Sequence, residues 1–259
     1  MTAIAAPRGH YRFRNVARME WIKLRSLRST WWTLALSAGA AIAIAIAVGF
    51  NTPVTSRHED LTNNALAGVS AGLLLTGVLG VLMMTSEYTS GMIRATLAAA
   101  PNRPLMLAAK AAVFGGVALV LGEATSFIAF FAGGAALRHG IAAPALSQPG
   151  ALRAVLLTGA SFCLIGLLGM GLGAIIRHTA AAVAVMVGGV YVAVQAVVLI
   201  KHQLLAYLPV PIVANSLSAT RPMTGDVHVL SPWAGLGLLC LYAAVLLGAG
   251  GWLLCRRDA

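Results

Sequence analysis

Six long runs of apolar residues, separated by short polar stretches, set the pattern of this sequence. A helix needs about 20 apolar residues to cross a bilayer, and each run is long enough to do so. The predicted spans are residues 31–50, 65–85, 105–136, 151–176, 179–200 and 232–254. The third run exceeds one crossing, so we expect it to tilt, project or bend. The pattern predicts an all-α integral membrane protein with a single transmembrane domain over residues 1–259.

The segment before the first run, residues 1–30, combines basic and aromatic residues. On a helical wheel one side carries apolar residues, interrupted by Glu20 and Arg28, and the other side is basic. The apolar side comprises Val16, Trp21, Leu24, Leu27 and Trp31, and the basic side includes Arg14, Arg18 and Arg25. Such a helix lies along a membrane surface with its tryptophans at the headgroups. We therefore predict an amphipathic interfacial helix that contains Glu20, Trp21, Lys23, Arg25 and Arg28.

A second polar segment joins the second and third runs. Thr89 or Ser90 suits the cap of a short helix over residues 91–99, and Pro101 helps to end that helix. Pro104 suits the first turn of the next helix. We expect Glu87 and Arg94, which are seven residues apart, to share one side of a continuous helix. A short helix held between two spans is able to pass motion from a soluble partner into the membrane, and a short connecting helix without a partner is equally open.

Composition and charge agree with a membrane protein. Hydrophobic residue types make up 59% of the chain and charged types 10%, whereas soluble domains have about a quarter charged residues. The net charge is +11, but the basic residues lie beside apolar runs and form no long basic arm, which argues against nucleic-acid binding. The three cysteines include no CxxC pair, which argues against a disulfide framework or a thiolate metal site.

The distribution of lysine and arginine predicts the orientation. Cytoplasmic loops of membrane proteins are enriched in these residues. With the N-terminus inside, 13 of them fall on the cytoplasmic side and 5 on the outer side. We therefore expect a multi-pass protein with both termini in the cytoplasm. The 30-residue link after the fifth run contains an apolar stretch, LLAYLPVPIVANSL, for which short helices at the outer membrane surface and a loop packed on the bundle are both open.

Two cytoplasmic motifs together resemble a known family. Glu20-Trp21-Ile22-Lys23-Leu24-Arg25-Ser26 precedes the first span, and Glu87-Tyr88-x-x-Gly91-x-Ile93-Arg94-x-Thr96-Leu97 follows the second. With Pro101-x-Arg103, Ala109-Lys110 and Leu208-Pro209, this pattern is similar to the type-2 ATP-binding-cassette (ABC) permeases of bacterial exporters. The six-span pattern extends the resemblance over essentially the whole chain.

The resemblance implies an ATP-driven exporter in the bacterial cell membrane. The N-terminal helix would be the connecting helix, and the later segment would be the coupling helix that docks on a separate cytoplasmic ATPase subunit. The coupling residues would be Glu87, Tyr88, Gly91, Met92, Ile93, Arg94 and Thr96. A second permease subunit, identical or different, would complete the translocation path, and short re-entrant helices would follow the fifth span. The chain has no G-x-x-x-x-G-K-[ST] motif, so we expect it to bind no cofactor and ATP and magnesium to bind to the partner.

Glu123 is the one acidic residue that the pattern places well inside a span. An intramembrane carboxylate is a functional candidate, either in the pathway, at a subunit interface or in a packing role. The alternatives to an exporter are a proton-coupled secondary transporter that uses Glu123 and a membrane anchor or sensor that transports nothing. The Gly68-x-Ser70-x-Gly72 and Gly159-Ala160-Ser161 motifs resemble those of serine hydrolases and rhomboid proteases, but close helix packing explains them more simply.

Overall fold

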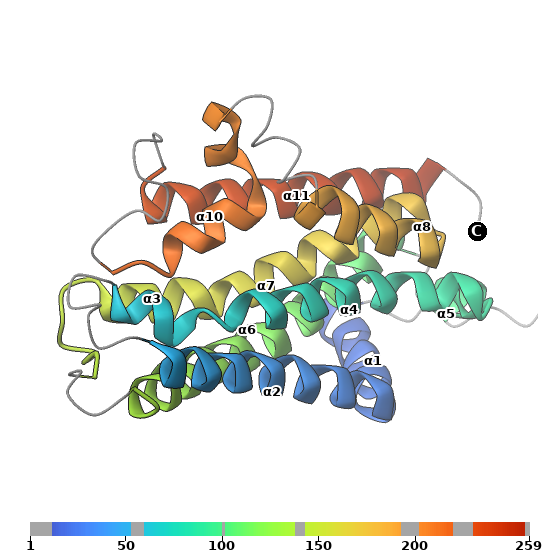
Figure 1. The fold of residues 1–259 in the computed structure, drawn as a ribbon. Helices are drawn as coiled ribbons and strands as arrows, with labels where there is room; N and C mark the ends of the chain where they lie inside the picture. The colour runs from blue at the N-terminus through green and yellow to red at the C-terminus, as the bar shows by residue number, and fades with distance from the viewer. Residues whose placement is uncertain are drawn as a thin grey trace, which may run out of the picture.

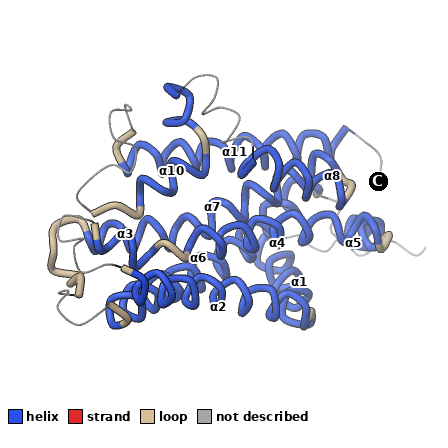
Figure 2. Tube along the Cα trace, in the orientation of Figure 1, coloured by secondary structure: helices blue, strands red, loops and turns tan. Residues whose placement is uncertain are grey.

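The structure is a computed structural model that describes residues 12–52, 60–99, 102–137, 143–192, 202–219 and 230–256. These residues form helices and no strands. The long helices run lengthwise in one bundle, and shorter helices lie at its two ends (Figures 1 and 2). The predicted all-α fold is confirmed for the described residues.

Five helical units within the described residues are long and apolar enough to cross a membrane. They are α2 (Arg28–Asn51), α3 (Leu61–Leu66) taken together with α4 (Val69–Thr89), α6 (Arg103–Ala135), α7 (Ala151–Ile176) and α11 (Pro232–Arg256). They correspond to the first, second, third, fourth and sixth predicted spans. Helices of this length and apolar composition are those of a membrane protein.

The fifth predicted span is described only in its first part. It begins as α8 (Thr179–Ala184) and continues as a π-helical segment, Val185–Val192. Together they form an apolar helix shorter than a full crossing, and residues 193–200 lie outside the described residues. The sixth crossing therefore stays a prediction.

Small residues let α7 pack closely at the centre of the bundle, where it contacts α4, α6 and α11. A side chain at Gly80 would collide with the carbonyl oxygen of Gly166, and one at Gly169 would collide with that of Gly77. In membrane helices, where lipid is as apolar as the side chains, close backbone approach of this kind drives association. The glycines at the α4–α7 contact are therefore packing positions.

The two serine motifs are accounted for in the same way. Gly68 and Gly72 each lie against a backbone carbonyl of α2, and Ser70 is exposed on the opposite side of α4. Ser161 is buried and donates its hydroxyl to the carbonyl oxygen of Leu157. Packing, as expected from the sequence, explains these residues.

Helix α6 is longer than one crossing requires. Its 33 residues extend over about 50 Å at 1.5 Å per residue, against a hydrocarbon core of about 30 Å. The Asn102 side chain accepts a hydrogen bond from Leu105 N–H at the start of the helix, and Pro104 lies in its first turn, as predicted. Because α6 is unbroken over its length, the excess projects beyond the apolar layer or is taken up by tilt.

One end of the bundle carries α1 (Phe13–Ser26) and α5 (Met92–Ala99) (Figure 1). Helix α1 lies across the bundle, packing mainly against the start of α6. The predicted apolar side of this segment was partly wrong: Val16, Glu20 and Leu24 are buried, whereas Trp21, Leu27 and Trp31 are exposed. Leu27 and Trp31 are separated from α1 because that helix ends at Ser26 and α2 begins at Arg28. Trp21 lies on α1 itself, on its exposed side.

The opposite end holds the segment after the fifth predicted span. A 3₁₀-helix (His202–Tyr207) and α10 (Pro209–Ser216) form there, so the apolar stretch is helical. Two charged residues hold the chain that follows α10. The Asp60 carboxylate accepts the Ala219 N–H at 2.6 Å, and the Arg153 guanidinium donates to the carbonyl oxygens of Ser218 and Ala219 at 2.9 and 3.2 Å.

Candidate functional site

Four charged side chains meet at the end of the bundle that carries α1 and α5. The ammonium of Lys110 on α6 lies 2.5 Å from Glu20 Oε2 on α1 and 2.7 Å from Glu87 Oε1 on α4. Lys110 and Glu20 are each 2% exposed, and Glu87 is 7% exposed. Lys110 therefore joins three helices inside the protein.

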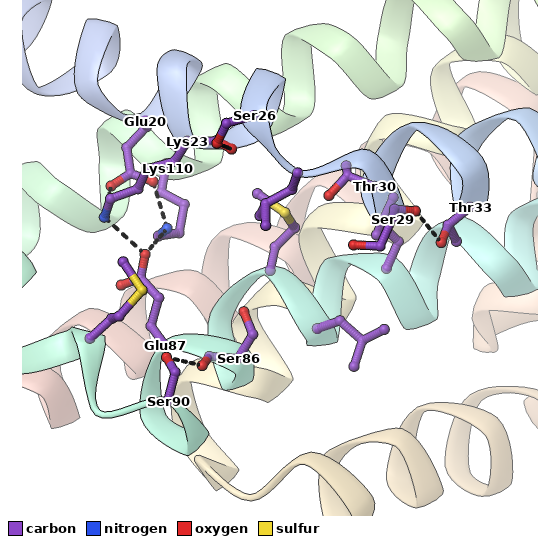
Figure 3. A pocket seen from close by; sticks show the side chains of 15 residues that line it. Glu20, Lys23, Ser26, Ser29, Thr30, Thr33, Ser86, Glu87, Ser90 and Lys110 are labelled. Carbon is purple, nitrogen blue, oxygen red and sulfur yellow. Dashed lines mark hydrogen bonds and ion pairs between the residues drawn. The ribbon is translucent and has the colours of Figure 1, made fainter.

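Lys23 on α1 extends the cluster to α5. Its ammonium donates to Glu20 Oε1 at 3.2 Å, to Glu87 Oε1 at 3.1 Å and to Thr96 Oγ1 at 2.9 Å. An ammonium has three N–H donors, and these three contacts use them all. We call Glu20, Lys23, Glu87, Lys110 and Thr96 the charge cluster (Figure 3 shows the four charged members).

The charge cluster is electrically balanced. A charged side chain buried among apolar helices is costly unless it is paired. Two carboxylates and two ammonium groups cancel here, and each charged side chain has at least two partners. Removing one member would leave its partners buried and uncompensated, which makes the cluster a rigid connection between α1, α4, α5 and α6.

The break between α4 and α5 directs α5 back toward the charge cluster. Gly91 has φ +69°, a left-handed conformation that glycine adopts readily. The hydroxyls of Thr89 and Ser90 both donate to the Ser86 carbonyl oxygen, so they close the end of α4. They were expected to cap the following helix, and none of the described contacts gives them that role.

The expected continuous helix from Glu87 to Arg94 is therefore wrong. Glu87 and Tyr88 lie in the last turn of α4, and Arg94 lies on α5 beyond the break at Gly91. Glu87 turns inward to the charge cluster and Arg94 is exposed. The two residues cannot form one charged surface for a partner.

Helix α5 has an inner and an outer side. Ile93 and Thr96 are buried, Ile93 in the apolar core and Thr96 against Lys23. The exposed residues of the segment are Thr89, Ser90, Gly91, Met92, Arg94, Ala95 and Ala98. The Arg94 guanidinium has no hydrogen-bond or ion-pair partner among the described residues. The outer side of α5 thus presents one free cation among small and apolar side chains.

The residues predicted for the interfacial helix also divide into two groups. Glu20 and Lys23 belong to the charge cluster, whereas Trp21, Arg25 and Arg28 are exposed. The sequence reasoning treated Glu20 as an interruption of the apolar side, and the structure gives that interruption a reason.

Two further arginines tie α11 to the same end. Arg103 Nη1 donates to the Leu254 carbonyl oxygen at 2.6 Å, and Arg177 Nη2 donates to that of Leu253 at 3.2 Å. The Arg177 guanidinium also lies 5.2 Å from the centroid of the Tyr88 ring. Cations at the C-terminal end of a helix donate to its free carbonyl groups and interact favourably with the negative end of the helix dipole. The ends of α4, α6, α7 and α11 are thus fixed relative to one another.

Glu123 lies apart from the charge cluster, at the α6–α7 contact. A side chain at Gly159 would collide with the Glu123 carboxyl group, so this glycine makes room for it. The Glu123 Oε2 atom is buried and has no hydrogen-bond partner among the described residues. Lys110, which the sequence separated from Glu123, is bound to Glu20 and Glu87.

Lys110 was named in the sequence only as part of the permease resemblance and was given no role in a site. It was counted with the cytoplasmic basic residues because it follows the polar link. Its position offered a signal, because a lysine seven residues into an apolar helix requires a buried counterion. The sequence matches no protein-family model and no curated protein.

Proposed function

We propose that this chain is the membrane-spanning permease subunit of an ATP-driven exporter of the type-2 ABC kind. A separate cytoplasmic subunit would bind ATP and magnesium and hydrolyse the nucleotide. The observation that carries the proposal is α5, a short exposed helix held from inside by the charge cluster and joined to the ends of α4 and α6. Both acids of the charge cluster and one of its two lysines belong to the segments that resemble permease motifs, Glu20-Trp21-x-Lys23 and Glu87-Tyr88-x-x-Gly91.

Motion of α5 has a direct route into the bundle. Thr96 on α5 contacts Lys23, and Lys23 contacts Glu20 on α1 and Glu87 on α4. Lys110 then connects both carboxylates to α6. Because buried, mutually paired charges resist separation, a displacement imposed on α5 would move α1, α4 and α6 together. This is the mechanical requirement for coupling a soluble ATPase to a transport path.

The outer side of α5 fits the docking surface of such a subunit. Arg94 supplies a positive charge for an acidic residue of the ATPase, and Met92, which is 50% exposed, supplies an apolar group for a groove. We propose that Arg94, Met92 and Ala95 contact the ATPase, and that Glu87, Ile93 and Thr96 hold the helix in position from behind.

The charge distribution supports a cytoplasmic location for this surface. Of the 18 lysines and arginines, 12 lie in the described residues and 11 of these lie at the end that carries α1 and α5. The exception is Arg153 at the opposite end. By the positive-inside rule the α1–α5 end faces the cytoplasm. We propose a bacterial cell-membrane location, both termini in the cytoplasm, and pairing with a second permease subunit.

One observation favours a second candidate, a proton-coupled carrier. The buried Glu123 Oε2 has no described partner, as expected for a carboxyl group that takes up and releases a proton. Glu123→Gln would abolish proton-gradient dependence of transport in that case. In the exporter, transport stays dependent on ATP in this variant, and its rate changes only if Glu123 lines the pathway.

The test of the exporter is co-purification from native membranes in mild detergent. The wild-type chain should bring with it a nucleotide-hydrolysing subunit, and Arg94→Glu should lose it. Removing one partner of a desolvated charge pair costs about 2–5 kcal/mol, and charge reversal costs at least as much. Arg14→Glu, an exposed arginine on α1 away from α5, is the matched control and should keep the subunit. A wild-type chain that purifies without any such subunit would remove the basis of the proposal.

A further inference from the structure

A cavity of about 440 Å³ lies beside the charge cluster, between the first turns of α2 and the last turns of α4. The charge cluster lies at one end of the cavity, and hydroxyl side chains of α2 lie at the other (Figure 3). This volume is in the range of ligand sites. We infer that the cavity binds a neutral lipid alcohol, a molecule with a hydroxyl group and an apolar chain, from the adjacent membrane leaflet. This role is separate from docking of the ATPase, because side chains of this chain alone line the cavity.

The Thr30 hydroxyl supplies the first argument. Thr30 is 3% exposed and lines the cavity, and its hydroxyl makes no hydrogen bond among the described residues. Figure 3 shows this side chain directed from α2 toward α4. The hydroxyls of Thr33 and Ser90, which also line the cavity, donate to the carbonyl oxygens of Ser29 and Ser86. A buried hydroxyl without a partner is costly, and a ligand that forms a hydrogen bond with Thr30 removes that cost.

The charges beside the cavity disfavour a charged head group. Glu20, Lys23, Glu87 and Lys110 line it, and their charges cancel in mutual ion pairs. The Glu87 Oε2 atom is buried and has no hydrogen-bond partner among the described residues, so it would repel a carboxylate or a phosphate. A cationic head group would add a third positive charge to two carboxylates that the lysines already neutralise. Because burying an uncompensated charge is costly, the head group that fits is neutral.

The α4 side of the cavity suits the apolar chain of the ligand. Leu79, Leu82 and Met83 form an apolar wall there. Trp31 and Trp32 on the first turn of α2 are 39% and 76% exposed, and tryptophans gather at the headgroup level of membranes. The cavity therefore lies at the depth where the head group and the chain of a lipid meet, so a membrane alcohol fits it better than a water-soluble one.

Photoaffinity labelling of the purified full-length chain in detergent tests the inference. The probes are decanol, decanoate, decylammonium and decane, each with the same diazirine on its chain, and mass spectrometry of peptides locates the labels. Decanol should label the α4 wall, residues 79–83, at least about fivefold more than the other probes, because it alone supplies a neutral hydrogen bond. An excess of monoacylglycerol should remove this label, and an excess of glycerol should not. Labels on the lipid-facing sides of the helices, which all four probes should produce alike, serve as the reference.

Two threonines of α2 provide a matched pair of variants. Thr30→Val removes the hydroxyl that has no described partner, nearly without changing side-chain size, and should lower decanol labelling of the wall by about fivefold. Thr33→Val makes the same change in the same cavity. The Thr33 hydroxyl already donates to the Ser29 carbonyl oxygen, so this variant should label as the wild type does.

A second pair of variants tests the cavity itself. Ser86→Leu fills it without changing charge and should abolish decanol labelling of the wall, whereas Ser70→Leu, at an exposed position of α4 outside the cavity, should not. Equal labelling of the wall by decanol and decane, stronger labelling by either charged probe, or an equal loss in the two threonine variants would overturn the inference. A wall that no probe labels would leave the cavity to water and would overturn it as well.

Discussion

The Lys110 ammonium is placed between two carboxylates that come from distant parts of the chain. Glu20 is 90 residues away in sequence and Glu87 is 23 residues away. The motifs made Glu20 and Glu87 candidates on different elements. Their pairing was not predictable, because it depends on how α1 crosses the start of α6, and hydrophobic periodicity does not specify that crossing.

The first prediction is that Lys110→Met strongly destabilises the protein. The substitution leaves Glu20 and Glu87 buried with Lys23 as their only described cation. Breaking a buried ion pair on one side costs about 3–5 kcal/mol. Unfolding of the detergent-solubilised protein measures the loss, and Arg18→Met, at an exposed position, should change stability by less than about 0.5 kcal/mol.

The double variant Lys110→Met with Glu20→Gln provides the decisive comparison. It removes one charge of each sign and should recover part of the loss, because fewer uncompensated charges stay buried. A single Lys110→Met variant as stable as the wild type, or a double variant with no recovery, would contradict the buried charge cluster.

Among the elements, the long helices were the most predictable. Five apolar runs correspond to five long helices, and the fourth was predicted at its observed bounds, Ala151–Ile176. The break after α4 was harder to place. Gly91 was assigned to the short helix, but its positive φ ends α4 and turns α5 inward, so Glu87 and Arg94 separate. A glycine pattern shows where a chain is able to turn, and tertiary contacts decide whether it does.

The second prediction concerns the contact between α4 and α7. Gly80→Ala should destabilise the protein by about 1–3 kcal/mol, because the added methyl group meets the Gly166 carbonyl oxygen in a close-packed contact. Gly39→Ala on α2 is the matched control, since an added Cβ there meets nothing within 4 Å. In a helix the control should be neutral or stabilising by up to about 1 kcal/mol. Thermal unfolding of the two variants compares them, and an equal effect would argue against this contact.

For the whole molecule, the distribution of basic residues carries the orientation. The count of 13 lysines and arginines on the cytoplasmic side against 5 on the outer side depended on an assumed number of membrane crossings. In the structure the described basic residues other than Arg153 gather at one end without that assumption, because α1, α5 and the ends of α7 and α11 meet there. Residues 193–200 of the fifth predicted span and the segment over residues 220–229 lie outside the described residues, so the complete topology stays a prediction.

The third prediction tests this orientation in cells. In a cysteine-free background, a single cysteine at Gln148 should react with an impermeant thiol reagent added outside, and one at Asn102 should react only after permeabilisation. Both positions are exposed. They lie at opposite ends of the bundle, Gln148 near the start of α7 and Asn102 at the start of α6. Labelling of Asn102→Cys in intact cells would reverse the orientation and remove α5 from the cytoplasm.

The proposed function depends on contact between the outer side of α5 and a soluble ATPase. Site-specific photo-crosslinking in the native host tests it most directly, with a benzophenone amino acid placed at Ala95 on that side and, as the control, at Gln148 on the opposite end. Both residues are exposed. Ala95 should crosslink to a soluble nucleotide-hydrolysing polypeptide, and Gln148 should not. Expression and insertion of the Ala95 variant without any such crosslink would contradict this contact.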